Sequence, residues 1–115
     1  MWGSGQARRE FTYVGDLASW IAANLERIGE LPGLLNLGIG KDYSIDEFYL
    51  AAMNVIDYQV PLVHNRSKPE GMQARLMDSS MARNSYGWEP SIDLIEGLNR
   101  TYSWFLKTKD KNARV

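Results

Sequence analysis

The chain of 115 residues has no cysteine and only one histidine, so it can form neither a disulfide nor a Cys/His metal cluster of its own. Its 13 basic and 14 acidic side chains give a net charge of −1, which excludes the basic field that attracts nucleic acid or anionic membranes. No apolar run reaches the ~20 residues of a membrane span, and no signal peptide opens the sequence. We therefore expect a cytoplasmic protein without a nucleic-acid or membrane partner.

Aromatic residues, by contrast, are abundant: four Trp, six Tyr and three Phe make up 11% of the chain. The length supports a single domain, residues 1–115, which would bury ~65% of the surface that its unfolded form exposes. Large rings supply much of the burial in a domain with few elements, so most of these aromatics are expected to pack in the core.

Strand and helix patterns alternate along the chain, which predicts an α/β or α+β fold with a small mixed sheet and about three main helices. Asp16, Ser44 and Ser91 are the expected helix caps, and Ser44 with Glu47 forms a capping-box signature. The charged tail, 107–115, is expected to fray. Strands are predicted at 7–14, 34–37 and 61–64, helices at 17–28, 44–57 and 91–105, a brief extended piece at 75–77 and a helical turn near 80–84.

The segment from Trp2 to Phe11 has the composition of an anion-binding site. A loop of small residues lets the backbone approach a ligand closely. Trp2 before the loop offers a flat apolar face, and Arg9 after it offers a bidentate fork for a phosphate or carboxylate. The chemistry alone indicates half of a site for an anion that carries a ring.

This order of residues, Trp-Gly-Ser-Gly, three further residues and Arg-Glu-Phe, then Val14 and Asp16-Leu17, resembles one segment of the GDP-L-fucose synthases. These are nucleotide-sugar epimerase-reductases of the extended short-chain dehydrogenase class. The resemblance implies that Trp2 and Arg9 contact a GDP-sugar, as those positions do in the family. Because the match starts at residue 2, the chain resembles the C-terminal substrate-binding lobe of a larger enzyme.

A second match lies in the loop Ser67-Lys68-Pro69-Glu70-Gly71, which resembles the family's Ser-Lys-Pro-acid-Gly loop. A solvated turn would explain this loop by itself, but beside the first match we favour the binding function, and the resemblance implies that Glu70 contacts the nucleotide sugar. Arg75 is either a further phosphate contact or a partner in a surface salt bridge. Gly15 and Ala74 depart from the family's acidic and basic residues, which leaves the fine specificity open.

The groups that perform the family's chemistry are missing from this sequence. None of its six tyrosines is followed four residues later by lysine, and the Gly-x-Gly-x-x-Gly turn of dinucleotide-binding proteins is absent. Gly38-Ile39-Gly40-Lys41 fails the spacing of a phosphate loop and is expected to be a plain turn. We therefore expect that this chain binds no cofactor, that NADPH belongs to the full-length family, and that the chain alone is inactive.

The leading hypothesis is a substrate-binding lobe whose partners are a GDP-sugar or other nucleotide sugar and a missing N-terminal Rossmann domain. The face that meets such a domain should expose apolar residues to water. Two alternatives stay open: a non-catalytic module that binds a nucleotide sugar or a protein by itself, and a lobe of a related epimerase or dehydratase. His64 is expected to have a structural or surface role, and no metal site is expected.

Overall fold

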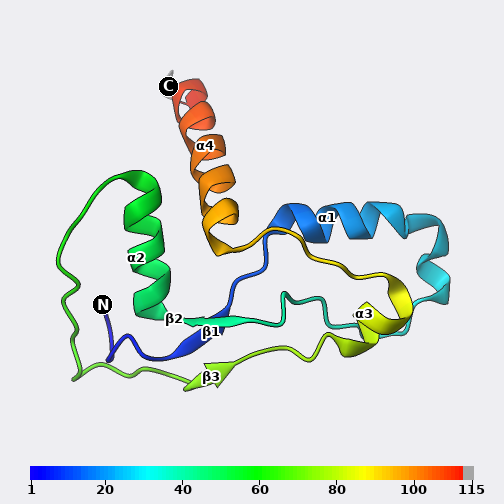
Figure 1. Cartoon of the computed structure of the whole chain (residues 1–115), viewed down its shortest axis with the longest axis horizontal. Helices are drawn as coiled ribbons and strands as arrows, with labels where there is room; N and C mark the ends of the chain where they lie inside the picture. Colours follow the sequence, from blue (N-terminus) through cyan, green and yellow to red (C-terminus); the bar gives the residue numbers. More distant parts are fainter. Residues whose placement is uncertain (113–115) are drawn as a thin grey trace.

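The N-terminal segment supplies the middle strand of a three-stranded mixed sheet. The computed structural model describes the backbone of residues 1–112 and the side chains of residues 1–109. Strand β1 (Arg8–Glu10) pairs antiparallel with β2 (Asp42–Ser44) and parallel with β3 (Ala74–Arg75), so the strand order is β2-β1-β3 (Figure 1). The small mixed sheet flanked by helices confirms the expected fold class.

Helix α2 (Ile45–Ile56) follows β2 directly because Ser44 and Glu47 form the predicted capping box. The Ser44 hydroxyl accepts from the Glu47 amide at 3.1 Å, and the Glu47 carboxylate accepts from the Ser44 amide at 2.6 Å. Hydrogen bonds from the backbone and side chain of Ser44 hold the pKa of Glu47 below its ordinary value. Helix α4 (Leu94–Asn112) stands beside α2, as the ribbon shows (Figure 1).

The other end of the molecule contains helix α1 (Val14–Ala23), the 3-10 helix η1 (Leu25–Glu30) and the short helix α3 (Ser80–Tyr86). Trp88 joins this end to the rest, because it is only 1% exposed and its indole N–H donates to the Gly38 carbonyl at 2.7 Å. Its ring meets the ring of Trp20 edge to face at 6.3 Å, and Trp20 in turn donates to the Tyr86 carbonyl.

Two predicted helix caps are wrong, and each error has a physical reason. Asp16 does not cap α1, which already begins at Val14; its carboxylate accepts from the amides of Ser91 and Ile92, both at 3.1 Å. Ser91 does not cap α4 either, because Asp93 accepts from the Glu96 amide at 2.9 Å. Asp16 is used instead for a contact between segments far apart in the sequence.

The predicted strand 7–14 shortens to three residues, and the strands predicted at 34–37 and 61–64 do not form. Within the part of the chain that the structure describes, the sheet has three strands, and neither segment has a neighbour in it. Leu34 is 82% exposed and Leu35 and Leu37 are only partly buried, so this apolar run does not form the middle of a sheet. The extended piece predicted at 75–77 corresponds to β3, and the turn predicted near 80–84 corresponds to α3.

Much apolar surface is uncovered at this end of the molecule. Helix α1 has no buried residue although most of its side chains are apolar. The radius of gyration of 17.2 Å also exceeds the ~13 Å typical of a compact domain of this length. Exposed apolar side chains of this end include Val14, Ile21, Leu25, Ile28, Leu34 and Met81.

No helix between residues 1 and 112 is long and apolar enough to cross a membrane.

Candidate functional site

The four residues predicted to bind ligand lie on two neighbouring segments, 2–9 and 70–75. The Trp2 backbone forms a parallel bridge with Asn65, and β1 continues the contact by pairing with β3. Between them the Arg8 amide donates to the Gln73 carbonyl at 2.7 Å. The sequence predicted these residues as a set, and the fold brings their two segments side by side.

Glu70 is held against the small-residue loop. The Ser4 amide donates to one carboxylate oxygen, and the Gln73 side chain lies 3.5 Å from the other. Gly3 makes this approach possible, because its φ is +77° and a Cβ there would collide with the Glu70 side chain. Hydrogen bonds from the side chain and backbone of Ser4 lower the pKa of Glu70, with Gln73 and the charge of Arg66 adding to the effect. Glu70 is therefore a fixed, ionised acceptor at neutral pH.

The indole of Trp2 is exposed to solvent and lies beside the cationic side chain of Lys68. The side chain is 69% exposed, and Lys68 Nζ lies 5.6 Å from the ring centroid, within the range of a cation–π contact. Nothing in the order of residues marked Lys68 as a site residue, although it belongs to the loop that carries Glu70. An exposed indole next to a lysine is a suitable platform for an anionic ring compound.

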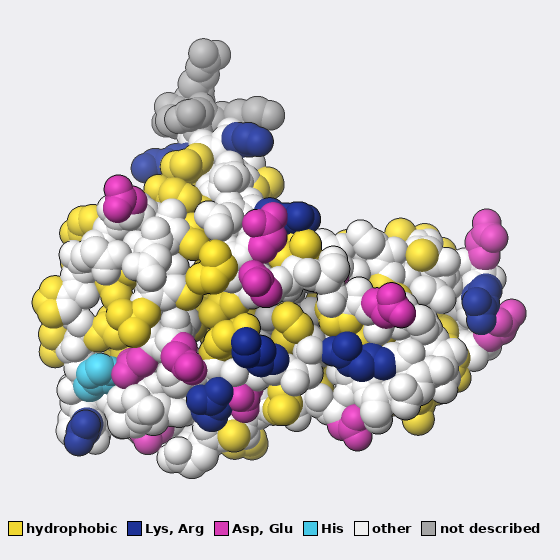
Figure 2. All heavy atoms as spheres, in the orientation of Figure 1, with side chains coloured by type: hydrophobic (Ala, Val, Ile, Leu, Met, Phe, Trp, Pro, Cys, Tyr) yellow, Lys and Arg dark blue, Asp and Glu magenta, His cyan; other side chains and the backbone are white. Residues whose placement is uncertain are grey.

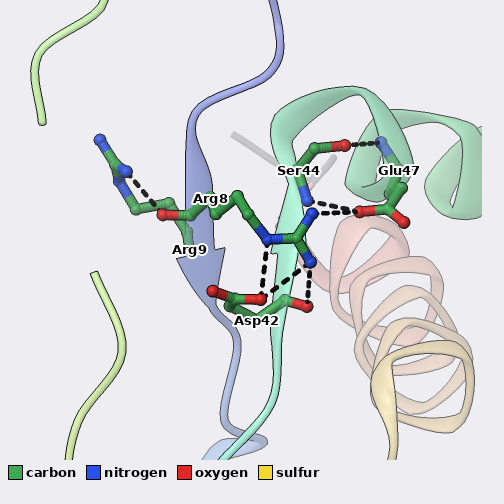
Figure 3. Close-up of polar contacts among 5 residues, drawn as sticks. All are labelled: Arg8, Arg9, Asp42, Ser44 and Glu47. Carbon is green, nitrogen blue, oxygen red and sulfur yellow. Dashed lines mark hydrogen bonds and ion pairs between the residues drawn. The ribbon is translucent and has the colours of Figure 1, made fainter. Parts of the chain in front are cut away.

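The adjacent arginines of β1 have different environments because side chains alternate along a strand. Figure 3 shows Arg8 turned toward β2 and the start of α2, with Arg9 pointing away from them. Arg8 Nη2 lies 2.8 Å from the Asp42 carboxylate, and Nη1 lies 3.5 Å from Glu47. The hydrogen bond with Asp42 raises the pKa of Arg8 further above its ordinary value. Arg8 is thus engaged in holding β1 to β2.

Arg9 is the register partner of Arg75 on β3, so the backbones of two arginines lie at the same level of the sheet. Arg9 donates to the Arg8 carbonyl at 2.6 Å and reaches the turn at Gly71, where a Cβ would be 3.9 Å from Nη2. Neither Arg9 nor Arg75 forms an ion pair with any side chain among residues 1–109. Like charges on neighbouring strands repel, and a bound anion would remove that repulsion.

Figure 2 shows basic and acidic side chains intermixed over the sheet and apolar side chains gathered over α2 and α4 on this face. The turn Gly38-Ile39-Gly40-Lys41 does not compete for phosphate, because its amides already have protein partners. The Gly38 amide donates to the Ser79 hydroxyl at 2.8 Å and the Gly40 amide to the Glu10 carboxylate at 2.6 Å. The predicted strand-to-helix turn is wrong in its neighbours, because no strand precedes this segment and β2 follows it.

No protein-family model matches the chain. Among curated proteins, the chain is 36% identical to a GDP-L-colitose synthase from Yersinia pseudotuberculosis, over 97% of this chain and 36% of that protein. It is 37% identical to GDP-L-fucose synthase 1 from Arabidopsis thaliana, over 93% of this chain and 32% of that protein. The chain thus spans about a third of the length of these relatives.

Solved structures give the same picture. A GDP-6-OMe-4-keto-L-xylo-heptose reductase from C. jejuni matches with a TM-score of 0.82 and 34% identity, over 94% of this chain and 33% of that one. The GDP-mannoheptose C4 reductase MlghC from Campylobacter jejuni, solved with NADP bound, matches with a TM-score of 0.76 and 33% identity, over 92% and 34%. By sequence and fold, the chain is similar to about a third of the length of GDP-sugar synthases and reductases, among them the GDP-L-fucose synthases.

Proposed function

We propose that this chain is the substrate-binding part of a nucleotide-sugar epimerase or reductase and that Trp2, Arg9, Glu70 and Arg75 contact the nucleotide sugar. The observation that carries the proposal is the pair of arginines at one level of the sheet, without carboxylate partners among the described side chains. Two guanidinium groups at one position suit a diphosphate, which offers several anionic oxygens to bidentate donors.

The remaining residues complement such a ligand on either side of its phosphates. Trp2 offers an exposed ring face for a base or a sugar, and Lys68 beside it adds positive charge. Glu70 is held ionised by Ser4 and can accept hydrogen bonds from vicinal hydroxyls or from the N–H groups of a guanine edge. A GDP-sugar has a diphosphate, a guanine base and sugar hydroxyls, and the names of the relatives contain GDP-sugars.

The catalytic groups of the full-length enzyme would lie outside this chain. We propose that the whole protein epimerises a GDP-4-keto-6-deoxy-mannose and reduces it, with NADPH as the hydride donor. The described residues do not fit the cofactor, since they contain no Gly-x-Gly-x-x-Gly turn and the amides of Gly38 and Gly40 are bonded to Ser79 and Glu10. This chain's own contribution is to bind and orient the sugar nucleotide.

The uncovered helix α1 indicates where the rest of the enzyme would pack. Val14, Ile21, Leu25 and Ile28 are each about half exposed or more and belong to consecutive turns of α1 and η1. Relatives have about two thirds of their length beyond the matched part, enough for a further domain. We propose that a Rossmann domain of the full-length protein covers this surface.

Calorimetric titration with GDP, and with UDP in parallel, tests the proposed site. GDP should bind, and Arg9→Ala and Arg75→Ala should each weaken binding about tenfold or more, which corresponds to at least ~1.4 kcal/mol. Arg27→Ala is the matched control, because Arg27 is exposed and, among the side chains of residues 1–109, forms an ion pair with Glu30 alone. In a full-length enzyme the same two site variants should raise KM more than they lower kcat. An unchanged KM in both would remove these arginines from the site.

A further inference from the structure

His64, the single histidine, forms a contact that the proposed function does not use. Its Nε2 lies 2.7 Å from Asp46 Oδ1, and both side chains are about three-quarters buried, with 24% and 21% exposed. A ring N–H of His64 at Nε2 donates to the Asp46 carboxylate oxygen in this pair. Asp46 belongs to the first turn of α2, whereas His64 ends the irregular segment 57–64 that leads away from the other end of that helix.

Asp46 also holds the small-residue loop that follows Trp2. Its amide donates to the Gly5 carbonyl at 3.0 Å, and its second carboxylate oxygen lies 3.3 Å from the Gln6 side-chain amide. Gly5 has φ +78°, and a Cβ at this position would collide with the Asp46 carboxylate. One carboxylate therefore joins three segments: the loop 3–6, the start of α2 and the end of segment 57–64.

The contact lies directly next to the backbone bridge that carries Trp2. Asn65, the residue after His64, donates to the Met1 carbonyl at 2.8 Å and accepts from the Gly3 amide at 2.9 Å. Five residues further on, Glu70 accepts from Ser4 in the same loop. Pro61, Leu62 and Val63 have no polar side-chain groups, so His64 supplies the polar side-chain contact at this end of the segment.

We propose that the His64–Asp46 pair is a positioning contact for the nucleotide-sugar site. It fixes the loop that carries Trp2 against the segment that carries Glu70 and itself touches no ligand. This inference rests on the proposed function, because Trp2 and Glu70 are the residues whose relative placement it controls. Without the hydrogen bond, the bridge between Trp2 and Asn65 opens more often, and Trp2 and Glu70 are no longer held in a fixed position relative to each other.

Two variants separate the hydrogen bond from the packing of the ring. His64→Phe keeps a ring and removes the donor, whereas His64→Gln places an amide donor within reach of Asp46. In His64→Phe, amide hydrogen exchange at Gly3 and Asn65 should accelerate about fivefold, and GDP affinity should fall by a similar factor, as expected for the loss of one hydrogen bond. His64→Gln should restore most of both. Arg27→Gln, remote from the site, should change neither.

The outcomes are distinguishable from those of the proposed function itself. Unchanged exchange at Gly3 and Asn65 in His64→Phe overturns the inference, and so does an equal defect in His64→Gln, which would assign the effect to ring packing. Faster exchange with unchanged GDP affinity also overturns it, since the loop position would then not matter to the ligand. If the wild-type chain and the full-length enzyme both bind no GDP, the proposed function fails, while the exchange data still report whether the pair holds the loop.

Discussion

The two ends of this molecule differ in how far their side chains are held by contacts within the described chain. Around the sheet, Arg8, Asp46 and Glu70 each bind groups from other segments, and the loops between them are fixed by hydrogen bonds. At the other end, α1 is an apolar helix without one buried residue. The sheet end therefore has polar contacts that fix its loops, whereas α1 has no buried side chain. Large apolar side chains are exposed at both ends, for example Ile21 near α1 and Val63 near the sheet.

Trp88 should show the largest effect on stability, because it is buried and joins Trp20 of α1 to Gly38 in the segment that leads to β2. Trp88→Ala should lower the free energy of unfolding by about 3–5 kcal/mol, as for other buried aromatics, and urea denaturation measures the loss. Trp104→Ala is the matched control, since Trp104 is 64% exposed on α4 and should change stability by less than ~0.5 kcal/mol. Equal losses in the two variants would contradict the assignment of Trp88 as the connecting residue.

Gly3, beside the sheet, and Gly29, in η1, differ in the space that a side chain would find. Gly3→Ala should cost about 1–3 kcal/mol, because its φ is +77° and the new methyl group would collide with Glu70. At Gly29 in η1 a Cβ meets nothing within 4 Å and φ is not positive, so Gly29→Ala should be neutral or slightly stabilising. Chemical denaturation of both variants provides the measurement, and a greater cost at Gly29 would reverse the comparison.

The exposed face of α1 and η1 should tolerate polar substitutions in the isolated chain. Ile21→Gln and Ile28→Gln should each change stability by less than ~0.5 kcal/mol, because these side chains are already 48% and 61% exposed. They should also reduce self-association in sedimentation experiments, since apolar surface is removed. In a full-length enzyme the same changes should cost more, up to about 2 kcal/mol each, if this face is covered there. Equal effects in both proteins would show that the face stays open.

The smallest expected effect is the pH dependence of stability that Glu70 contributes at the sheet end. The folded-state pKa of Glu70 is lowered below its ordinary value of 4.5, so its contribution to stability is present above that pH and is lost as the pH falls toward the folded-state pKa. The melting temperature of the wild type should therefore fall more between pH 7 and acid pH than that of Glu70→Gln. Parallel profiles for the two proteins, measured by circular dichroism, would contradict the proposed environment of Glu70.

Features encoded within a few residues of one another were predictable from the sequence. The capping box of Ser44 and Glu47 is local, and it correctly marked the start of α2. The strands expected at 34–37 and 61–64 failed because a strand needs a neighbour, and periodicity does not supply one. Asp16 was misassigned for a similar reason, since its partner amides lie about 75 residues away.

The candidate site shows the same division. The types of its residues were available from the sequence and its family resemblance, but their arrangement was not. Nothing in the order of residues indicated that Arg8 would bind Asp42 while Arg9 would lie level with Arg75. Lys68 also went unnoticed, because its position over Trp2 depends on the bridge between Trp2 and Asn65. Whether these residues bind a nucleotide sugar stays a prediction.

The pairing of Arg9 with Arg75 on neighbouring strands has a practical consequence for the choice of buffer. Strand β3 is two residues long, and one of its two register pairs joins like charges. A multivalent anion that bridges the two arginines would stabilise the folded chain through mass action. Phosphate or sulfate buffers would thus raise the apparent melting temperature and compete with a sugar nucleotide, whereas chloride solutions of the same ionic strength would do so far less.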